Sequence, residues 1–240
     1  MKSKLKPHIV PLLSIVISII VGVVFNDYFL GTITLICGFL NSYYAAIGKW
    51  QNYIYSIGFN IFYAYICAIN GLYGFLIFTL LVYIPIQIYG LINWLKNKNK
   101  KDNIIDMKSL NIKSATILCV CVVILSVGLG FLLNLIPNQN LAFMDSTSQI
   151  FNICGLVAQS LRFRESWYIS LANNSIDVVI WIINAVKLTP NSPMMLITNI
   201  VYLVMNIVGI VCWIILEKKQ KEQKLILNPP AKLNSHSGKK

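Results

Sequence analysis

The chain has 240 residues, of which 57% are hydrophobic and only 12% are charged. A soluble domain carries about 25% charged residues, so this composition excludes an ordinary soluble protein and indicates several membrane-spanning helices of roughly 20 apolar residues each. The net charge of +12 does not indicate nucleic-acid binding, because the basic residues lie between and beyond the apolar stretches, where they set membrane orientation.

Eight apolar stretches are expected to cross the membrane as α-helices. The first follows a lysine-rich segment but has no small-residue cleavage site, so an uncleaved span is preferred to a signal peptide. The sixth is diluted by Asn, Gln, Ser and Thr residues, which makes it the weakest of the eight. The predicted spans cover residues 9–25, 29–48, 51–69, 71–95, 114–135, 146–163, 166–187 and 193–216.

The distribution of positive charge predicts the orientation of these spans. If the N-terminus is cytoplasmic, every one of the 20 lysines and arginines except Lys187 falls on the cytoplasmic side. Moving any single span in or out would destroy this segregation. The sequence therefore predicts that both termini are cytoplasmic, with a basic cytoplasmic loop over residues 96–113 and a disordered basic tail over residues 217–240.

The chain contains two copies of one pattern of residues, displaced by 117 residues at first and by 119 residues further on. At the shorter displacement the matched residues are Ile36-Cys37-Gly38, Trp50 and Asn60 with Ile153-Cys154-Gly155, Trp167 and Asp177. At the longer displacement they are Thr79, Tyr83, Gln87, Gly90 and Trp94 with Thr198, Tyr202, Asn206, Gly209 and Trp213. A duplicated membrane unit is typical of transporters, which hold the substrate between two halves.

We therefore expect an all-α integral membrane protein with eight transmembrane helices. Each copy contains three spans and one further span separates the copies, so both enter the membrane in the same direction as a parallel repeat. The expected parts are residues 1–28 (cytoplasmic tail and accessory first span), 29–95 (first three-helix repeat), 96–113 (basic loop), 114–135 (linker span), 146–216 (second three-helix repeat) and 217–240 (basic tail).

Cysteine and histidine usage excludes several chemistries. All six cysteines lie in apolar stretches without C-x-x-C spacing, which is typical of buried thiols that act as small apolar side chains. Both histidines, His8 and His236, lie in the terminal segments, so no Cys–His pair, Ser–His–Asp triad or zinc site is expected within the membrane. The sequence predicts a protein that is not an enzyme and that uses no metal or cofactor.

The repeated polar residues of the fourth and eighth spans recur every three or four positions, which places them on one face of each helix. Unpaired amide and hydroxyl groups are costly against lipid, so these faces are expected to point into the protein. Gly90 and Gly209 favour close helix packing, whereas Gln87 and Asn206 favour contact with a substrate. The tryptophans that end the two stripes are interpreted as membrane-interface anchors.

Asp177 is the one acidic residue expected deep within a span. It lies 10 residues after Trp167, about 15 Å along the helix and hence near the middle of the bilayer. An aspartate at that depth costs about 2.5–3.5 kcal/mol, and no predicted span interior contains a lysine or arginine to pair with it. It is therefore protonated, hydrogen-bonded to amides, or paired with a positive charge on the substrate. We favour the cationic substrate.

Aromatic and amide residues accompany Asp177 on the predicted interior faces of the third and seventh spans. Aromatic faces stabilise cations, and carboxamides can hydrogen-bond ribose hydroxyls or a carboxamide of the ligand. Asn60 has the position in the first copy that Asp177 has in the second. The site is therefore expected to be asymmetric and to suit a flat, polar, positively charged ring. The predicted substrate-binding residues are Asp177, Asn60, Gln87, Asn206, Asn173, Tyr83, Trp181 and Tyr63.

Each copy contains its own set of distinctive motifs. They are Gly71-Leu72-Tyr73-Gly74 with Tyr83, Gln87, Gly90 and Trp94 in the first copy, and Asp145-Ser146, Gln159, Arg164-Glu165-x-Trp167 and Asn173 in the second. With these motifs the chain resembles, from Gly31 to Trp213, the Pnu family of bacterial vitamin transporters, whose best-known branch carries nicotinamide riboside. The resemblance implies two parallel three-helix bundles joined by a linker helix, an architecture similar to that of the SWEET sugar transporters.

The resemblance also implies facilitated diffusion of nicotinamide riboside, an NAD precursor, across the bacterial plasma (inner) membrane by alternating access. Cytoplasmic phosphorylation would then trap the substrate, so no ATP site is expected in this chain. The pyridinium of nicotinamide riboside suits Asp177. The thiazolium of thiamine, which a sister branch carries, suits it equally, whereas neutral riboflavin fits less well.

Two alternatives stay open: thiamine uptake by the same fold and mechanism, and a substrate-binding subunit of a separately energised vitamin importer. The internal repeat weighs against the second, because alternating access needs two moving halves. The expected partners are the small cationic vitamin and the lipid bilayer, with no nucleic acid. The sequence leaves homo-oligomerisation open.

Overall fold

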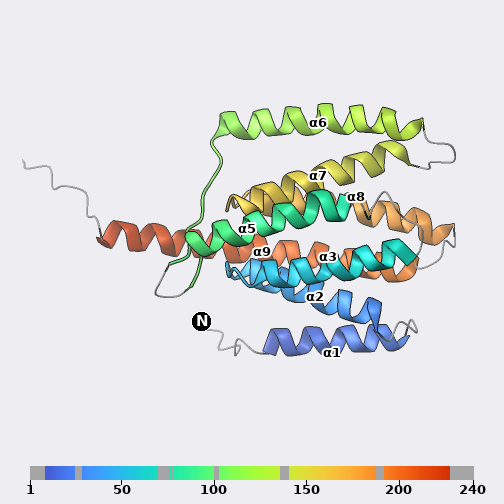
Figure 1. The fold of residues 1–240 in the computed structure, drawn as a ribbon. Coiled ribbons are helices and arrows are strands. Elements are labelled where there is room, and N and C mark those ends of the chain that lie inside the picture. The colour runs from blue at the N-terminus through green and yellow to red at the C-terminus, as the bar shows by residue number, and fades with distance from the viewer. Residues whose placement is uncertain are drawn as a thin grey trace, which may run out of the picture.

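The computed structural model describes residues 9–24, 29–69, 76, 78–99, 103–135, 141–187 and 192–227. The regular elements of this described chain are helical (Figure 1). They are α1 (Ile9–Val24), α2 (Leu30–Ala46), α3 (Asn52–Ile69), the π-helical turn η1 (Thr79–Tyr83), α5 (Ile84–Lys96), α6 (Ile112–Asn134), α7 (Ala142–Ser160), α8 (Ser166–Val186) and α9 (Ser192–Leu227). Because α5 directly continues η1, the described chain forms eight helical segments, in the order that the hydropathy pattern predicts.

Two helix boundaries differ from those expected by four residues or more. The helix α7 begins at Ala142, before the predicted residue 146. The helix α9 continues to Leu227, so the prediction of a disordered tail from residue 217 is wrong for the first part of that tail. Outside the described residues lie the Gly71-Leu72-Tyr73-Gly74 motif, residues 1–8 and residues 228–240.

The extension of α9 has local causes. Its Glu, Lys and Gln residues are good helix formers, and Lys221 Nζ lies 2.8 Å from Glu217 Oε1, four residues earlier. Glu217 also accepts a 2.6 Å hydrogen bond from Arg164 Nη1 in the turn before α8. The hydrogen bonds that Arg164 donates to the Glu217 and Glu165 carboxylates raise the pKa of its guanidinium. These contacts hold the extension against the rest of the protein.

Local sequence also explains two helix starts. Asn111 Oδ1 accepts a 2.7 Å hydrogen bond from the Ser114 backbone N–H, which caps α6. Pro85 lies in the first turn of α5, directly after η1. A proline in an unbroken α-helix would clash with an earlier carbonyl, and the wider π-helical turn occurs where this conflict would arise.

Six of the described helices form a bundle, and two lie at its edges. In the first half, α2 packs against α3 and α3 packs against α5; in the second half, α7 packs against α8 and α8 packs against α9. Contacts of α2 with α9 and of α5 with α7 join the two halves. The helix α1 packs against α2 and α6 packs against α7, at opposite edges of the bundle (Figure 1).

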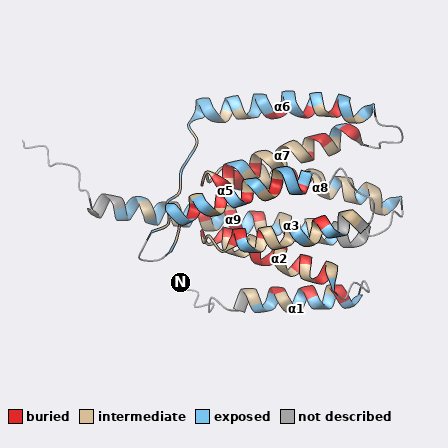
Figure 2. Cartoon of the chain, in the orientation of Figure 1, coloured by how far each residue is buried: buried red, intermediate tan, exposed pale blue. Residues whose placement is uncertain are grey.

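Apolar side chains cover much of the outer surface. The helix α6 is exposed along most of its length, whereas buried residues gather within the bundle (Figure 2). Among the described residues, three helical segments are long and apolar enough to cross a membrane, and a shorter apolar stretch lies in α1. They are Ile112–Asn134, Ser166–Val186 and Leu196–Gln223, with Pro11–Val24 as the shorter stretch. Helices α2, α3, α5 and α7 carry polar side chains that face the bundle interior.

Two glycines allow aromatic side chains to fill the bundle. A Cβ at Gly90 would lie 2.5 Å from the Tyr53 ring, and a Cβ at Gly209 would lie 2.2 Å from the Trp167 ring. The absent side chains let α3 approach α5 and let α8 approach α9. The packing role predicted for both glycines is therefore confirmed.

Trp94 and Trp213, which end the two polar stripes, join the halves. They are 0% and 1% exposed. Trp94 Nε1 donates to the Gln159 carbonyl at 2.9 Å, and Trp213 Nε1 donates to the Ala45 carbonyl at 2.9 Å. Each bond crosses from one half to the other, so the interpretation of these tryptophans as membrane-interface anchors is wrong.

The two halves match in register, but not at the displacement expected for their first two helices. Gly48 and Arg162 have left-handed φ values of 70° and 71° in the turns after α2 and α7, and they lie 114 residues apart. The carbonyls of Ala45 and Gln159 are also 114 residues apart, whereas the tryptophans that donate to them are 119 residues apart. The 117-residue match is therefore wrong by three residues, about one helical turn.

We predict that Gly209→Ala lowers the free energy of unfolding by about 1–3 kcal/mol, because its Cβ would overlap the Trp167 ring. Gly128→Ala in the exposed helix α6 is the matched control, since a Cβ there meets nothing within 4 Å. Thermal unfolding in detergent, followed by size-exclusion chromatography, measures the difference. Equal midpoints for the two variants would contradict the packing argument.

Candidate functional site

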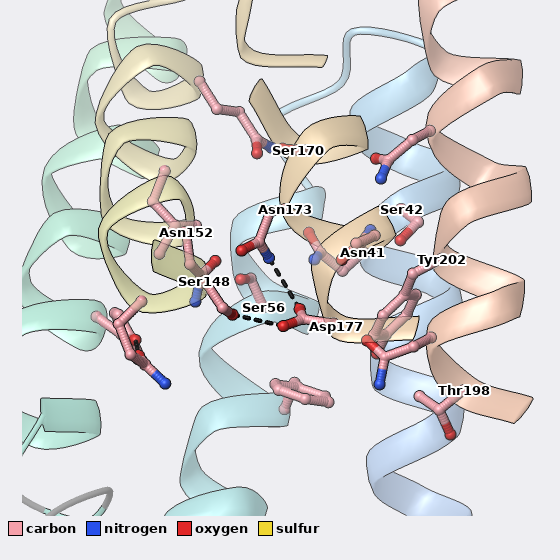
Figure 3. Close-up of a pocket in the computed structure, with 18 of the residues that line it drawn as sticks. Asn41, Ser42, Ser56, Ser148, Asn152, Ser170, Asn173, Asp177, Thr198 and Tyr202 are labelled. Atoms are coloured by element: carbon pink, nitrogen blue, oxygen red, sulfur yellow. Dashed lines mark hydrogen bonds between the residues drawn. The ribbon is translucent and has the colours of Figure 1, made fainter. Parts of the chain in front are cut away.

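A polar cavity of about 380 Å³ lies inside the bundle, between the two halves. Residues of α2, α3, η1 and α5 line one side, and residues of α7, α8 and α9 line the other. Among the described residues, α1 and α6 contribute nothing to the lining. Figure 3 shows amide, hydroxyl, carboxylate and aromatic side chains that point from several helices toward this common space.

All eight residues predicted to bind substrate line this one cavity. They are Asn60 and Tyr63 from α3, Tyr83 from η1, Gln87 from α5, Asn173, Asp177 and Trp181 from α8, and Asn206 from α9. Helical periodicity thus places their side chains correctly on the interior faces of four different helical segments. Their contact with a substrate stays a prediction.

Two neutral groups hold the Asp177 carboxylate. Ser148 Oγ donates to Asp177 Oδ1 at 2.5 Å, and Asn173 Nδ2 donates to Asp177 Oδ2 at 3.0 Å (Figure 3). No lysine or arginine from the described chain lines the cavity. Of the three possibilities raised by the sequence, hydrogen bonding to an amide is therefore present, but it brings no positive charge to Asp177.

A second carboxylate, Asp145, also lines the cavity. It is not among the predicted residues, because the predicted sixth span begins one residue after it. In the structure Asp145 lies in the first turn of α7, where the partial positive charge of the helix N-terminus favours an acid. Both cavity acids belong to the second half, and the described lining residues of the first half include none.

The asymmetry of the cavity differs from the expected one. At the 114-residue displacement Asp177 corresponds to Tyr63, and Asn60 corresponds to Asn174. All four residues line the cavity. The amide therefore recurs in both halves, and the difference between the halves is a phenol in the first and a carboxylate in the second.

Asn60 and Gln87 form a buried amide pair in the first half. Asn60 Nδ2 donates to Gln87 Oε1 at 2.9 Å and to the Ser56 carbonyl at 2.9 Å. The two amides are only 4% and 3% exposed. In the second half Asn206, the counterpart of Gln87, has a buried Nδ2 that finds no hydrogen-bond partner in the part of the chain that the structure describes.

Three amide atoms at the cavity are buried without a hydrogen-bond partner among the described residues, namely Asn41 Oδ1, Asn173 Oδ1 and Asn206 Nδ2. A buried polar atom without a partner costs roughly 1–3 kcal/mol. Two of these atoms accept hydrogen bonds and one donates. A ligand with hydroxyl or amide groups would satisfy both kinds.

The helix α7 supplies site residues that the sequence-based prediction omits. Ser148, Gln149 and Asn152 all line the cavity. Tyr83 of the first half donates its hydroxyl hydrogen to Gln149 Oε1 of the second. Polar residues of this kind make the sixth span weak in hydropathy, and they also mark the face of α7 that lines the cavity.

A polar cavity between two similar halves of an apolar helical bundle is the arrangement of a membrane transporter rather than of an enzyme. The chain belongs to the nicotinamide mononucleotide transporter family, whose sequence profile matches residues 28–215. Members of this family are transporters, so the prediction that the chain is not an enzyme is confirmed.

Individual relatives agree with this membership. The chain is 27% identical over 206 residues to the nicotinamide riboside transporter PnuC of Neisseria mucosa, which covers 83% of this chain and 78% of that protein. It is 24% identical over 159 residues to the nicotinamide riboside transporter PnuC of Haemophilus influenzae, which covers 65% of this chain and 69% of that protein. The resemblance to the Pnu family is confirmed.

The crystal structure of the vitamin B3 transporter PnuC has the same fold. It matches with a TM-score of 0.73 at 24% sequence identity, covering 89% of this chain and 92% of that one.

We predict that Asn60→Ala lowers the free energy of unfolding by about 1–3 kcal/mol, because Gln87 Oε1 would lose its donor while staying buried. Asn134→Ala at the exposed end of α6 is the matched control. Thermal midpoints of the two purified variants report the difference. A midpoint for Asn60→Ala equal to that of the control would show that the amide pair is not stabilising.

Proposed function

We propose that the protein carries nicotinamide riboside across the membrane by facilitated diffusion. The observation on which this depends is the pair of cavity carboxylates, Asp145 and Asp177, among amides and aromatic rings, with no basic side chain among the described lining residues. Such a site favours a cation that also has hydrogen-bonding groups. Nicotinamide riboside has a pyridinium charge, a carboxamide and ribose hydroxyls, and it is the substrate named for both relatives.

The same charges favour the riboside over the mononucleotide for which the family is named. A phosphate group carries negative charge, and its binding normally uses arginine, lysine or a cluster of backbone N–H groups. Here the described residues that line the cavity include the acids Asp145 and Asp177 but no lysine, arginine or histidine. At the low effective dielectric of a protein interior, their repulsion would exclude a phosphate.

We assign roles within the cavity by chemistry. The Asp177 carboxylate pairs with the pyridinium, and the Trp181 and Tyr63 rings contact its flat faces. Tyr63 is itself stacked on Phe59, with ring centroids 5.8 Å apart. The partnerless amide atoms of Asn173 and Asn206 contact ribose hydroxyls or the carboxamide. A volume of about 380 Å³ lies within the usual range of ligand pockets, roughly 300–1,000 Å³.

The same proposal includes a topology of eight transmembrane helices with two parallel three-helix repeats, residues 29–95 and 146–216. The matched left-handed turns and the reciprocal tryptophan bonds support it. The helix α6 acts as the linker that lets the second repeat enter in the same direction as the first, as in SWEET transporters, and α1 is accessory. The positive charge segregation supports cytoplasmic termini and a bacterial inner-membrane location.

Transport then occurs by alternating access, in which the two halves rock about the central cavity. The contacts of α2 with α9 and of α5 with α7 are the surfaces at which the halves would separate. The chain needs no energy source of its own, because phosphorylation in the cytoplasm traps the riboside.

Thiamine is the second candidate substrate, because its thiazolium charge would pair with Asp177 in the same way. The third candidate function is that of a substrate-binding subunit of a separately energised importer. Two halves that enclose one site favour a complete transporter over such a subunit. Uptake in cells that lack any such energising complex separates the two, because a binding subunit alone would not transport.

We predict that Asp177→Asn lowers uptake of nicotinamide riboside by about tenfold or more, because a buried charged hydrogen-bonding partner contributes about 1.5–3 kcal/mol. The isosteric amide keeps the shape of the cavity. Glu222→Gln, which neutralises an exposed acid on α9, is the matched control and should transport normally. Radiolabelled uptake into cells with equal amounts of each variant measures the effect. Uptake by Asp177→Asn at the control rate would refute charge pairing.

Competition against labelled nicotinamide riboside identifies the substrate. Unlabelled riboside should abolish uptake of the label, whereas nicotinamide mononucleotide, nicotinic acid riboside and riboflavin should compete weakly, because they add negative charge or lack the cation. Uptake is measured with each competitor in excess. If thiamine were the only competitor that inhibits uptake, the proposed substrate would be wrong and thiamine would be the substrate.

A further inference from the structure

The loop between α5 and α6 covers one end of the bundle. Its described residues are 97–99 and 103–111, and the stretch 103–111 is here called the strap. Ile105, at its centre, is 0% exposed. Its side chain packs in a cluster with Trp94 and Trp213, the two tryptophans that join the halves, and with Tyr53 and Trp167. An apolar loop residue is therefore inserted where the two halves meet.

Backbone hydrogen bonds connect the strap to the equivalent turn of each half. Ile105 N–H donates to the Gly48 carbonyl at 3.0 Å, in the turn after α2. Lys108 N–H donates to the Arg162 carbonyl at 3.0 Å, in the turn after α7, and Arg164 N–H donates back to the Lys108 carbonyl at 3.0 Å. Gly48 and Arg162 are the two residues with matching left-handed φ values. One short segment thus bridges both halves at the same level.

The extension of α9 also holds the strap. Gln220 Nε2 donates to the Ile105 carbonyl at 2.7 Å, and Gln220 Oε1 accepts from Met107 N–H at 3.2 Å. Arg162 Nη1 donates to the Asp106 carbonyl at 3.1 Å. The amide of Gln220 is thus matched to one acceptor and one donor of the strap, on both sides of Asp106.

The tryptophan cluster lies between the strap and the cavity. Trp167 and Ala45 belong both to the cluster and to the cavity lining, whereas Ile105, Trp94 and Trp213 belong to the cluster alone. A path from the cavity to this end of the bundle therefore meets the aromatic layer first and then Ile105. Opening this end requires the halves to separate here, and the strap is bonded to both.

We propose that the strap is a gate that holds this end of the cavity closed, and that Ile105 must leave its position between the halves before this end can open. The gate does not depend on the identity of the transported solute. A gate uncovers the tryptophan cluster from time to time in the folded protein. A static tether would keep the cluster covered for as long as the protein stays folded.

The test uses the thiol of Cys212, which packs against the same cluster. In the full chain the other five of the six cysteines are replaced by serine, and the protein is placed in lipid nanodiscs. Because Cys212 is half-buried, the increase over the parent rate at which a charged maleimide modifies it reports how often the cluster is uncovered. Ile105→Ala should raise this rate by about tenfold or more, because the truncated side chain fills its site poorly and the closed state loses packing.

Gln220→Ala should raise the labelling rate as well, because it removes two strap hydrogen bonds without touching the cluster. Two matched controls should label at the parent rate. Ile112→Ala makes the same truncation at a residue that is 86% exposed, and Gln223→Ala alters an exposed glutamine one turn further along α9.

Labelling at the parent rate in both Ile105→Ala and Gln220→Ala would overturn the proposal. If Ile105→Ala elutes as an aggregate on size-exclusion chromatography, Gln220→Ala alone decides, since its target lies outside the core. The readout needs no substrate, so a failure to transport nicotinamide riboside would leave the result for the strap unchanged.

Discussion

Two buried indole N–H groups connect the halves of this protein, and the remaining architecture is arranged around them. A buried tryptophan N–H needs an acceptor, and both donors find one in the last turn of a helix of the other half, where carbonyls lack the usual intrahelical partner. Trp94 reaches the end of α7 and Trp213 reaches the end of α2. These helices can end there because Gly48 and Arg162 turn the chain with positive φ. The cavity lies on one side of this joint.

The cavity keeps polar groups inside an apolar bundle by pairing them locally. The Asp177 carboxylate accepts from a hydroxyl and an amide, and Gln87 accepts from Asn60. Neutral donors of this kind lower the cost of a buried acid without cancelling its charge. The carboxylate therefore stays available to a ligand, which is the property that a basic partner within the protein would remove.

Much of this arrangement is predictable from sequence, because membrane helices must be apolar outside and polar groups must face inward. Periodicity alone places Asp177 and Gln87 on interior helix faces, and both line the cavity. The register of the repeat is not predictable in the same way. Trp50 and Trp167 are the same residue type, but only Trp167 packs against a glycine of a neighbouring helix, Gly209 of α9. The burial of Trp94 and Trp213 depends on contacts between distant segments, and a tryptophan beside lysines has the same sequence context at a membrane surface.

The placement of both acids has an electrostatic consequence. Asp145 and Asp177 belong to α7 and α8, while the described first-half lining offers only neutral groups. The potential inside the cavity therefore falls from one half to the other, and a cation bound there is attracted to one wall. If the halves rock as proposed, a bound cation would stay with α7 and α8, while the neutral first half would move past it. Two similar halves thus present different charges to one cavity.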